Sequence, residues 1–412
     1  MSVSSIEFLL FVLVGCAVVT NLPGKWPKQM ALAALNAFFL YLLLPDLPSL
    51  AALTAILLSG YFAGLWLRAH PSKLVLAGYL AALLAVFVVL KQYVFLKLFL
   101  PSWLVTHPIA IVGLSYMLFR QIHFVVDMSG RSIESPSLWT YANYQLSLFS
   151  LLSGPIQRYG EFQEFWQAPR PFFQDRHELL KTYLRILVGV IKMALIASAC
   201  LAAYERNARW FLDETRVEST TQWGAIKHFV SLFYLYPAYI YFNFSGYCDI
   251  VIGAAALVGL RLPENFDRPY LARNMIDFWS RWHRTLSFWI RDYIFTPLYK
   301  NLAQRWPAAA GTLAIFCFFI ALTLAGIWHG STWNFVVFGL LQGIGVSLAK
   351  FWENRLLRKV GRQGLKRYLA SPKIRIAATV ANFHFVCVTF LFFPAELDQC
   401  LRLLTNAFKG MM

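Results

Sequence analysis

The chain has 412 residues, of which 58% are apolar, and a mean hydropathy of +0.55, which is more apolar than a water-soluble domain requires. Its formal net charge is +17, and in a membrane protein an excess of Lys and Arg marks cytoplasmic loops, so the charge does not indicate nucleic-acid binding. The composition therefore predicts an all-α polytopic membrane protein and excludes a soluble globular domain.

Apolar segments recur along the chain and predict roughly ten to twelve membrane spans, several of them short enough to be re-entrant or interfacial. They occupy residues 6–20, 30–45, 49–66, 74–98, 107–126, 141–154, 180–204, 226–244, 247–262, 309–326, 333–351 and 374–394. Lys25 and Lys28 follow the first run and Arg68 and Lys73 the third, whereas the loop after the second run carries only Asp46, so we expect the N-terminus outside. The first run lacks a preceding basic residue, so we expect a retained span and not a cleaved signal peptide. We expect a single integral membrane domain over 1–412, with N-terminal spanning helices in 1–110 and a motif-bearing core in 111–395.

Two polar stretches interrupt the first half of this pattern. Residues 155–181 mix aromatic residues with both charge signs, which favours amphipathic helices on a membrane face. Residues 205–222 have mixed charge, and we expect them to form a loop on the outer side.

The stretch "YFNFSGYCDIVIG", residues 241–253, places three polar residues in an apolar segment around Gly246. These are Asn243, Ser245 and Asp249. Taken alone, the pattern also suits the broken helix of a transporter, in which unwound backbone binds a substrate.

The stretch "FWSRWHRTLSFWIRD", residues 278–292, is rich in tryptophan and arginine. Helical spacing predicts one interfacial helix that is too polar to span the membrane, with its apolar side formed by Trp279, Trp282, Leu286, Trp289 and Tyr293. Tryptophan and arginine also serve as membrane anchors. His283 lies on the flank of the apolar side, where a histidine needs either a partner or a function.

A strongly basic stretch, 350–375, is predicted to be cytoplasmic because Glu353 is the lone acid among many Lys and Arg residues. Lys300 and Arg305 precede the run 309–326. Both ends of the pair 309–326 and 333–351 should therefore be cytoplasmic, and the turn between them should lie in the outer half of the membrane.

This turn, "GIWHGSTW", places His329 between two glycines at a helix break. Ser331 or Thr332 is suited to cap the following helix. Irregular backbone at membrane depth is tolerated where it is buried in protein or lines a wet cavity, and an ionisable residue there is a candidate functional residue. An imidazole, with an ordinary pKa near ~6.5, suits general-base catalysis.

The six cysteines form no CxxC pair and lie almost entirely in apolar segments, and no histidines have metal-ligand spacing. We therefore expect neither a disulfide framework nor a bound metal.

Several long motifs in order resemble the membrane-bound O-acyltransferase family, in particular its bacterial branch with alginate O-acetyltransferases and D-alanyl transfer proteins of teichoic acid. They are "FSGYCDIVIG" at 244–253, "LPENFDRPY" at 262–270, "FWSRWHRTLSFWIRDYIFTPL" at 278–298 and "GIWHGSTWNFVVFGLLQG" at 326–343. The resemblance implies a ring of spanning helices around a thinned centre. It also implies that His329 is the principal catalytic residue and that His283 is a second essential or supporting one.

The resemblance further implies acyl transfer in a bacterial cytoplasmic membrane. The donor would be acetyl-CoA or an acyl-carrier-protein thioester, with no bound cofactor, and the acceptor a hydroxyl of a polysaccharide or lipid-linked polymer. An extracytoplasmic accessory subunit is an expected partner, besides membrane lipid. The residues proposed to line the substrate channel are Asn243, Ser245, Asp249, Trp282, Trp328, Arg281 and Arg291.

Three departures from the family pattern leave the acyl group and the acceptor open. Cys248 stands where serine is usual, "YKNLAQ" follows "FTPL" in place of "GGNR", and Pro394 stands where arginine is usual. Two other functional classes also stay open: a transporter or flippase, and a non-catalytic membrane scaffold of an export and acylation complex.

Overall fold

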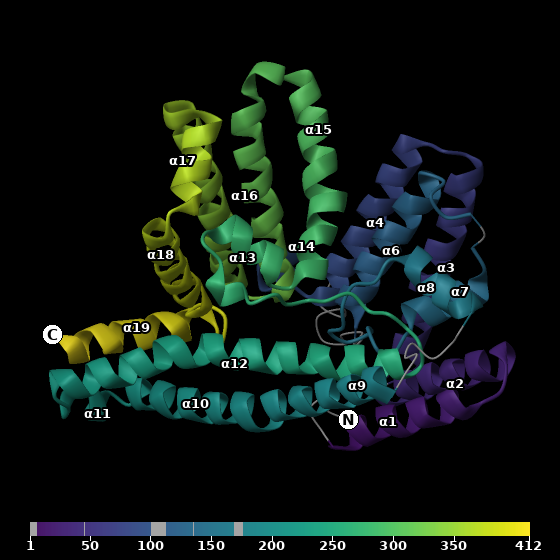
Figure 1. The fold of residues 1–412 in the computed structure, drawn as a ribbon, viewed down its shortest axis with the longest axis horizontal. Coiled ribbons are helices and arrows are strands. Elements are labelled where there is room, and N and C mark those ends of the chain that lie inside the picture. Colours follow the sequence, from purple (N-terminus) through teal and green to yellow (C-terminus); the bar gives the residue numbers. More distant parts are fainter. Residues whose placement is uncertain (1–5, 45, 100–112, 135, 169–175) are drawn as a thin grey trace. The chain divides into compact units, whose positions relative to one another are not determined.

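The computed structural model describes residues 6–44, 46–99, 113–134, 136–168 and 176–412. The described residues form helices joined by short turns, with no strand among them (Figure 1). In chain order the α-helices are α1 (Ile6–Asn21), α2 (Lys25–Leu43), α3 (Leu47–Ala69), α4 (Lys73–Lys91), α6 (Leu114–Ser129), α7 (Leu138–Gln145), α8 (Tyr159–Gln167), α9 (Arg176–Val190), α10 (Ser198–Leu212), α11 (Glu214–Glu218), α12 (Gln222–Leu257), α13 (Met275–Arg281), α14 (Arg284–Ile290), α15 (Thr296–Arg305), α16 (Ala310–His329), α17 (Trp333–Ala370), α18 (Pro372–Phe390) and α19 (Leu397–Met411).

Shorter helical turns of 3-10 or π geometry connect some of these helices. They are η1 (Val94–Phe99), η2 (Ile191–Ala197), η3 (Pro269–Leu271), η4 (Arg291–Phe295) and η5 (Pro307–Ala309). The chain divides into two compact units, the first formed by Met1–Ile191 with Gly246–Glu264 and the second by Lys192–Ser245 with Asn265–Met412. The single membrane domain over 1–412, with its boundary after residue 110, stays a prediction.

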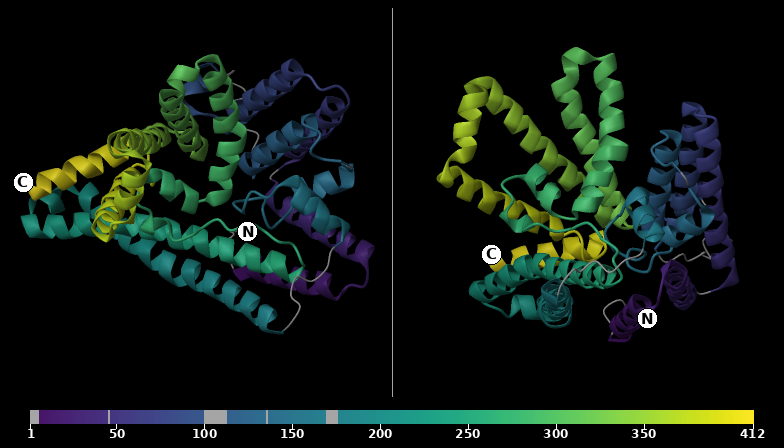
Figure 2. Two further views of the ribbon diagram at one scale, coloured as in Figure 1. Left: turned by 45° about the horizontal axis from the view of Figure 1, so that its top comes forward. Right: turned by 45° about the vertical axis from the view of Figure 1, so that its right-hand side comes forward.

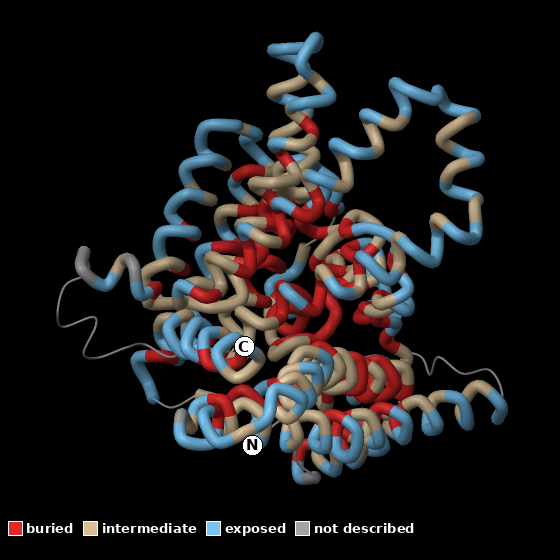
Figure 3. The backbone as a smooth tube through the Cα atoms, turned by 90° about the vertical axis from the view of Figure 1, so that its left-hand side faces the viewer, coloured by how far each residue is buried: buried red, intermediate tan, exposed pale blue. Residues whose placement is uncertain are grey.

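Six of the described helical segments are long and apolar enough to cross a membrane, which agrees with the predicted all-α polytopic class. They are Leu47–Ala69, Lys73–Lys91, Arg176–Leu212, Gln222–Leu257, Pro307–His329 and Trp333–Ala370. Only 11% of the most apolar window of α4 is buried, so most of that helix is left for contact with lipid. Figure 3 shows further long helical stretches whose residues are exposed. The total of ten to twelve spans stays a prediction, since the segment 107–126 begins outside the described residues.

The predicted span 141–154 is wrong. Helix α7 ends at Gln145, and turns follow it. The reason is the buried side chain of Arg120, whose Nη1 donates to the carbonyl oxygens of Tyr144 at 2.7 Å and Gln145 at 2.9 Å, while its Nη2 donates to the carbonyl oxygen of Ser150. A guanidinium that binds three carbonyl groups replaces the helical hydrogen bonds of this segment.

The predicted helix break around Gly246 is also wrong, because 226–244 and 247–262 fall largely within the single helix α12. The glycine serves close packing. A Cβ atom on Gly189 of α9 would lie 2.6 Å from the carbonyl oxygen of Gly246, so the two helices approach each other at glycine positions. The broken-helix interpretation of residues 241–253 is therefore withdrawn.

The first polar stretch contains helices, as predicted, and the second is more helical than predicted. Residues 155–181 contain α8 and the start of α9, whereas 169–175 lie outside the described residues. Residues 205–222 form the end of α10 and α11 instead of an open loop. Oppositely charged residues one helical turn apart, such as Glu205 and Arg209 at 3.6 Å, make a charged sequence compatible with a helix.

The basic stretch 350–375 is helical. It forms the second half of α17 and the start of α18, with a kink at Gly361, whose φ is 65°. The positive φ explains the glycine at this kink. The basic residues that follow Phe351 lie exposed along these helices.

Helices α16 and α17 form a tight hairpin in the second unit (Figures 1 and 2). Their backbones touch at glycine residues: a Cβ atom on Gly326 would lie 2.1 Å from the Cα atom of Gly339. One turn along α17, a Cβ atom on Gly343 would lie 2.8 Å from the carbonyl oxygen of Phe319. Any side chain at this crossing would separate the helices just below the turn that carries His329.

We expect Gly326→Ala to lower the free energy of unfolding by about 1–3 kcal/mol, the usual cost of overpacking a filled core. Gly311→Ala is the matched control in the same helix, since its Cβ atom would meet only the Nδ2 atom of Asn354, at 3.9 Å. Thermal unfolding of the purified protein in detergent would measure both. Equal midpoints for the two variants would contradict the packing argument.

Candidate active site

His329 ends helix α16 and precedes the short turn to α17, as the sequence predicted. Its side chain is partly exposed, and its ring contacts Trp328 at 4.9 Å, Phe393 at 5.4 Å and Phe338 at 6.0 Å between ring centroids. All three contacts are edge-to-face, an arrangement that aromatic rings favour, and they restrict the orientation of the imidazole.

The turn after His329 is held by its own side chains. Thr332 occupies the predicted N-cap position of α17, but its hydroxyl donates to the Oδ1 atom of Asn334 and does not cap the backbone. A Cβ atom at Gly330 would lie 2.0 Å from the ring of Phe335. Any side chain at this position would therefore have to displace the ring of Phe335.

His283 lies at a break between two helices, which corrects the prediction of one continuous helix over 278–292. Helix α13 ends at Arg281, and His283 has φ 43° and ψ 52°, a left-handed conformation that is uncommon outside glycine. The side chain is 1% exposed. Such a conformation persists only where surrounding contacts impose it, and it is frequent at functional sites.

The segment 262–270 imposes this conformation from outside the helix. The amide of Asp267 donates to the carbonyl oxygen of Arg281, and the amide of Arg284 donates to the carbonyl oxygen of Asn265, both at 3.0 Å. The Oδ1 atom of Asn265 also accepts from the hydroxyl of Thr285 at 2.7 Å and from its amide at 3.3 Å. The three bonds formed by Asn265 with Arg284 and Thr285 are called the Asn265 clamp below.

Sequence reasoning missed Asn265 as a site residue. It is fully buried, with 0% exposure, although asparagine is usually a surface residue. The available signal was its place in "LPENFDRPY", directly before the histidine-bearing stretch, but that signal did not specify the partner Thr285.

The tryptophans of this stretch are buried within the protein and are not membrane anchors. Trp279, Trp282 and Trp289 are 6%, 5% and 2% exposed. The indole nitrogen of Trp279 donates to Gln342 of α17 at 3.1 Å. The anchoring interpretation is therefore wrong for these three residues.

An unbroken chain of aromatic contacts in the second unit connects the two histidines. It runs from His283 through Phe244, Phe266, Trp282, Phe390 and Phe338 to His329, with ring centroids 4.9 to 6.0 Å apart at each step. We call these five residues between the histidines the aromatic wall.

Burial, and secondarily the nearby charge of His329, lowers the pKa of His283 to about 3. His283 is therefore a neutral imidazole at physiological pH.

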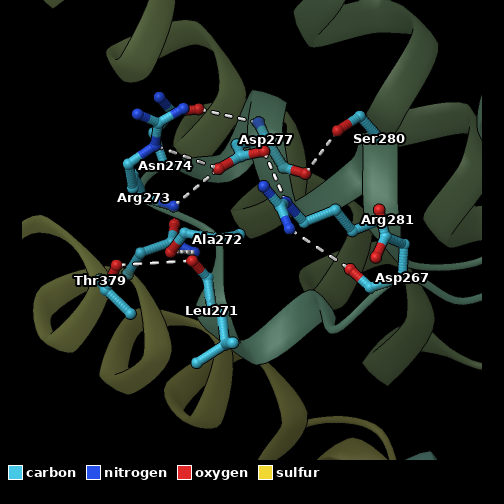
Figure 4. Close-up of polar contacts among 10 residues, drawn as sticks. Asp267, Leu271, Ala272, Arg273, Asn274, Asp277, Ser280, Arg281 and Thr379 are labelled. Atoms are coloured by element: carbon cyan, nitrogen blue, oxygen red, sulfur yellow. Dashed lines mark hydrogen bonds and ion pairs between the residues drawn. The ribbon is translucent and has the colours of Figure 1, made fainter. Parts of the chain in front are cut away.

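Arg281, proposed for the substrate channel, is engaged in a cluster at the start of α13 (Figure 4). Its Nε atom donates to Asp277 Oδ1 at 2.7 Å, and the amide of Arg273 donates to Asp277 Oδ2 at 3.1 Å. Burial raises the pKa of Asp277, but the bonds from Arg281 and Arg273 outweigh it, so the pKa lies below its ordinary value. Asn274 caps the helix by accepting from the amide of Asp277 at 2.9 Å. These contacts give Arg281 a role in holding α13.

Arg291 lies beside a different feature, a cavity of about 250 Å³ enclosed by α13, α14, η4, α16 and α17. Its walls include Trp279, Ser287, Phe288 and Leu322. The guanidinium of Arg291 lies 4.9 Å from the ring of Phe288, and its Nε atom is 2.8 Å from Asp292. The cavity is mainly apolar with one cation at its edge. Helix α14, whose Ser287 and Phe288 line the cavity, has His283 at its N-cap position.

The polar residues of α12 do not form one group. Ser245 is 4% exposed, and its hydroxyl has no hydrogen-bond partner among the described residues, whereas Asn243 is partly exposed. Asp249 belongs to the first unit, where it binds the Nε atom of Arg185 at 3.1 Å; Arg185 also holds Glu264 through two contacts of 2.6 Å. This ion-pair network gives Asp249 a structural partner.

Comparison with known proteins gives one family and several named relatives. The family model described as MBOAT, membrane-bound O-acyltransferase family, matches residues 84–392. A teichoic acid D-alanyltransferase of Bacillus subtilis is 27% identical over 415 residues, covering 95% of this chain and 97% of the relative.

Two further relatives are named for acetyl transfer. A probable alginate O-acetylase of Azotobacter vinelandii is 28% identical over 74% of this chain and 55% of the relative. A peptidoglycan O-acetyltransferase of Helicobacter pylori is 30% identical over 67% of this chain and 47% of the relative. The chain thus spans about half the length of these acetylating relatives.

Proposed function

Because the chain belongs to the membrane-bound O-acyltransferase family and is an O-acyltransferase of a multi-pass membrane type, we propose that it transfers an acetyl or D-alanyl group from a cytoplasmic thioester to a hydroxyl of a cell-envelope polymer, with His329 as the general base. The proposed location is a bacterial cytoplasmic membrane. An extracytoplasmic subunit is the proposed partner for delivery of the acyl group. The observation that carries the proposal is the pair of histidines joined by the aromatic wall.

The two histidines differ in ways that suit different roles. His329 is partly exposed, so an alcohol can reach its imidazole. In the proposed step it takes the proton of the acceptor hydroxyl as the oxygen attacks the thioester carbonyl carbon; the carbon–sulfur bond then breaks, and the thiolate leaves. His283 is buried and neutral, so we assign it a hydrogen bond to the carbonyl oxygen, where negative charge develops.

The cavity of about 250 Å³ beside Arg291 supports a short acyl donor. It lies below the ~300–1,000 Å³ of typical ligand sites, so it has room for a small acyl group on a thin arm and not for a long fatty chain. Arg291 at its edge supplies a cation for the phosphate of such an arm. The relatives named for acetyl and for D-alanyl transfer are consistent with either group.

The proposal is tested with the purified protein in sealed proteoliposomes. Labelled acetyl-CoA or a D-alanyl carrier-protein thioester is supplied on one side and a polymer on the other, and alkali-labile label on the polymer is counted. We expect ester formation with one of the two donors. Accumulation of labelled solute without ester would favour a transporter, and neither result with a folded protein would favour a scaffold.

The Asn265 clamp should matter for rate more than for donor binding. Thr285→Val removes the hydroxyl that Asn265 accepts while it keeps the side-chain shape, and we expect kcat to fall about tenfold to a hundredfold because small displacements of reacting groups cost this much. Thr285→Ser keeps the hydroxyl and should retain most of the rate. An equal loss in both variants, or a change confined to KM, would contradict a positioning role.

A further inference from the structure

A second and larger cavity, of about 670 Å³, lies in the second unit between α10, α12 and the chain after α18. Helix α19 runs beside α10 and α12 in Figures 1 and 2. The cavity borders an apolar cluster that includes Phe211, Leu232 and Leu403, of which the two leucines line the cavity. The volume falls within the ~300–1,000 Å³ of small-molecule sites, and neither the donor nor the two histidines occupy it in the proposed function.

Tyrosines form one side of this cavity. Tyr236 lies between Tyr204 at 5.1 Å and Tyr239 at 5.6 Å, measured between ring centroids. Tyr236 also approaches Phe393 at 6.4 Å, and Phe393 contacts the ring of His329 at 5.4 Å. Tyr236 and Phe393 therefore lie between a sugar unit seated on the tyrosines and the imidazole, so a neighbouring unit of the same polymer chain would have to reach His329.

The polar residues that line the cavity carry more negative than positive charge. Glu205, Glu396 and Gln399 line the cavity, with Arg209 as the one cation among the described lining residues. Arg209 lies 3.6 Å from Glu205, and both side chains are more than half exposed, so their mutual attraction is weak. Carboxylates accept hydrogen bonds from hydroxyl groups but repel phosphate and carboxylate groups, which have no proton to give.

Tyrosine rings together with carboxylate and amide side chains match a sugar or polyol, which has an apolar ring face and many hydroxyl donors. We infer that this cavity holds one sugar unit of the acceptor while a neighbouring unit presents its hydroxyl to His329, and that it selects an uncharged, hydroxyl-rich glycan over a polyanionic polymer. The inference rests on the proposed function, because it assigns the acceptor that His329 would deprotonate. It separates this chain from any enzyme whose acceptor carries a charge on each repeating unit.

Equilibrium binding tests the cavity without requiring catalysis. A neutral N-acetylglucosamine tetrasaccharide and a tetrauronate of equal length are titrated into the purified full chain, and binding is followed by microscale thermophoresis. We expect the neutral sugar to bind at least tenfold more tightly. Glu396→Gln should weaken its binding about tenfold, the effect of one lost hydrogen bond to a charged group, and Glu396→Lys should turn the preference toward the uronate.

Asp398→Asn is the matched control. It removes one negative charge two residues away, but Asp398 pairs with Arg402 at 2.9 Å and does not line the cavity, so binding should stay unchanged. In the transfer assay, Glu396→Gln should raise the acceptor KM and leave donor hydrolysis without acceptor unaltered. Equal effects of the two substitutions, or tighter binding of the uronate to the wild type, would overturn the inference.

The two proposals fail differently. If the neutral sugar binds as expected but no acyl group is transferred, the proposed function fails and the site stands. If transfer depends on His329 but favours the polyanion, the cavity assignment fails. A third outcome concerns Tyr236→Ala. If this variant binds the sugar as the wild type does but captures a membrane subunit differently, the cavity holds a protein partner, and the inference about the acceptor is overturned.

Discussion

Replacing His329 by alanine is expected to reduce the rate of acyl transfer by about 10²–10⁴-fold, the usual contribution of one positioned general base. The imidazole ends α16, is partly exposed and has its ring fixed by three aromatic neighbours. Without it, the acceptor hydroxyl must lose its proton to water. The rate is measured with labelled donor in proteoliposomes, at saturating donor and acceptor.

His384→Ala is the control for this measurement. His384 belongs to the same unit and also has an aromatic partner, since its Nε2 atom is 2.8 Å from the hydroxyl of Tyr234, but it is not part of the aromatic wall. Its loss should leave the rate within about twofold, well below the effect of a catalytic base. Wild-type transfer by a folded His329→Ala variant would refute the base assignment.

Acidification is expected to destabilise the wild-type protein through His283. The folded-state pKa of about 3 lies below the ordinary value of 6.5, so between these values the unfolded chain binds more protons at this residue. The stability is fully present above pH 6.5 and is lost as the pH falls toward 3, at roughly 1.4 kcal/mol per pH unit at most. Thermal unfolding in detergent from pH 7 to pH 4 gives the slope.

His283→Gln provides the comparison, because glutamine keeps a polar side chain of similar reach without a titrating group. Carboxylates titrate in both proteins, so the difference between the two slopes isolates the histidine. The variant should lose less stability per pH unit than the wild type over this range. Superimposable curves would show that His283 is accessible to protons in the folded protein.

The sequence predicted the elements whose causes are local. Two apolar runs predict helix α16 and the first half of α17, and the glycines at 326 and 330 predict the turn at His329 between them. The sequence also identifies the two stretches that carry the histidines as candidate site segments. For α16 and the start of α17, hydropathy and spacing were sufficient because each helix depends mainly on its own residues.

The features that were missed depend on residues distant in sequence. The helix break at His283 requires the segment containing Asn265, and the turns after α7 require Arg120 of another helix. Residue Gly246 resembles a helix breaker in isolation, but its absent side chain serves the contact with Gly189. Periodicity cannot distinguish a glycine that ends a helix from one that admits a neighbouring helix.

The contact between Gly326 and Gly339 limits how this scaffold can diversify. Two backbones without intervening side chains cannot slide or rotate past each other by small steps. The position of the His329 imidazole along the hairpin is therefore set by main-chain atoms. New substrate preferences must then arise from exchange of the side chains around that fixed point. Directed evolution of this enzyme would therefore gain more from libraries at Glu396 and Tyr236 than from changes within the hairpin.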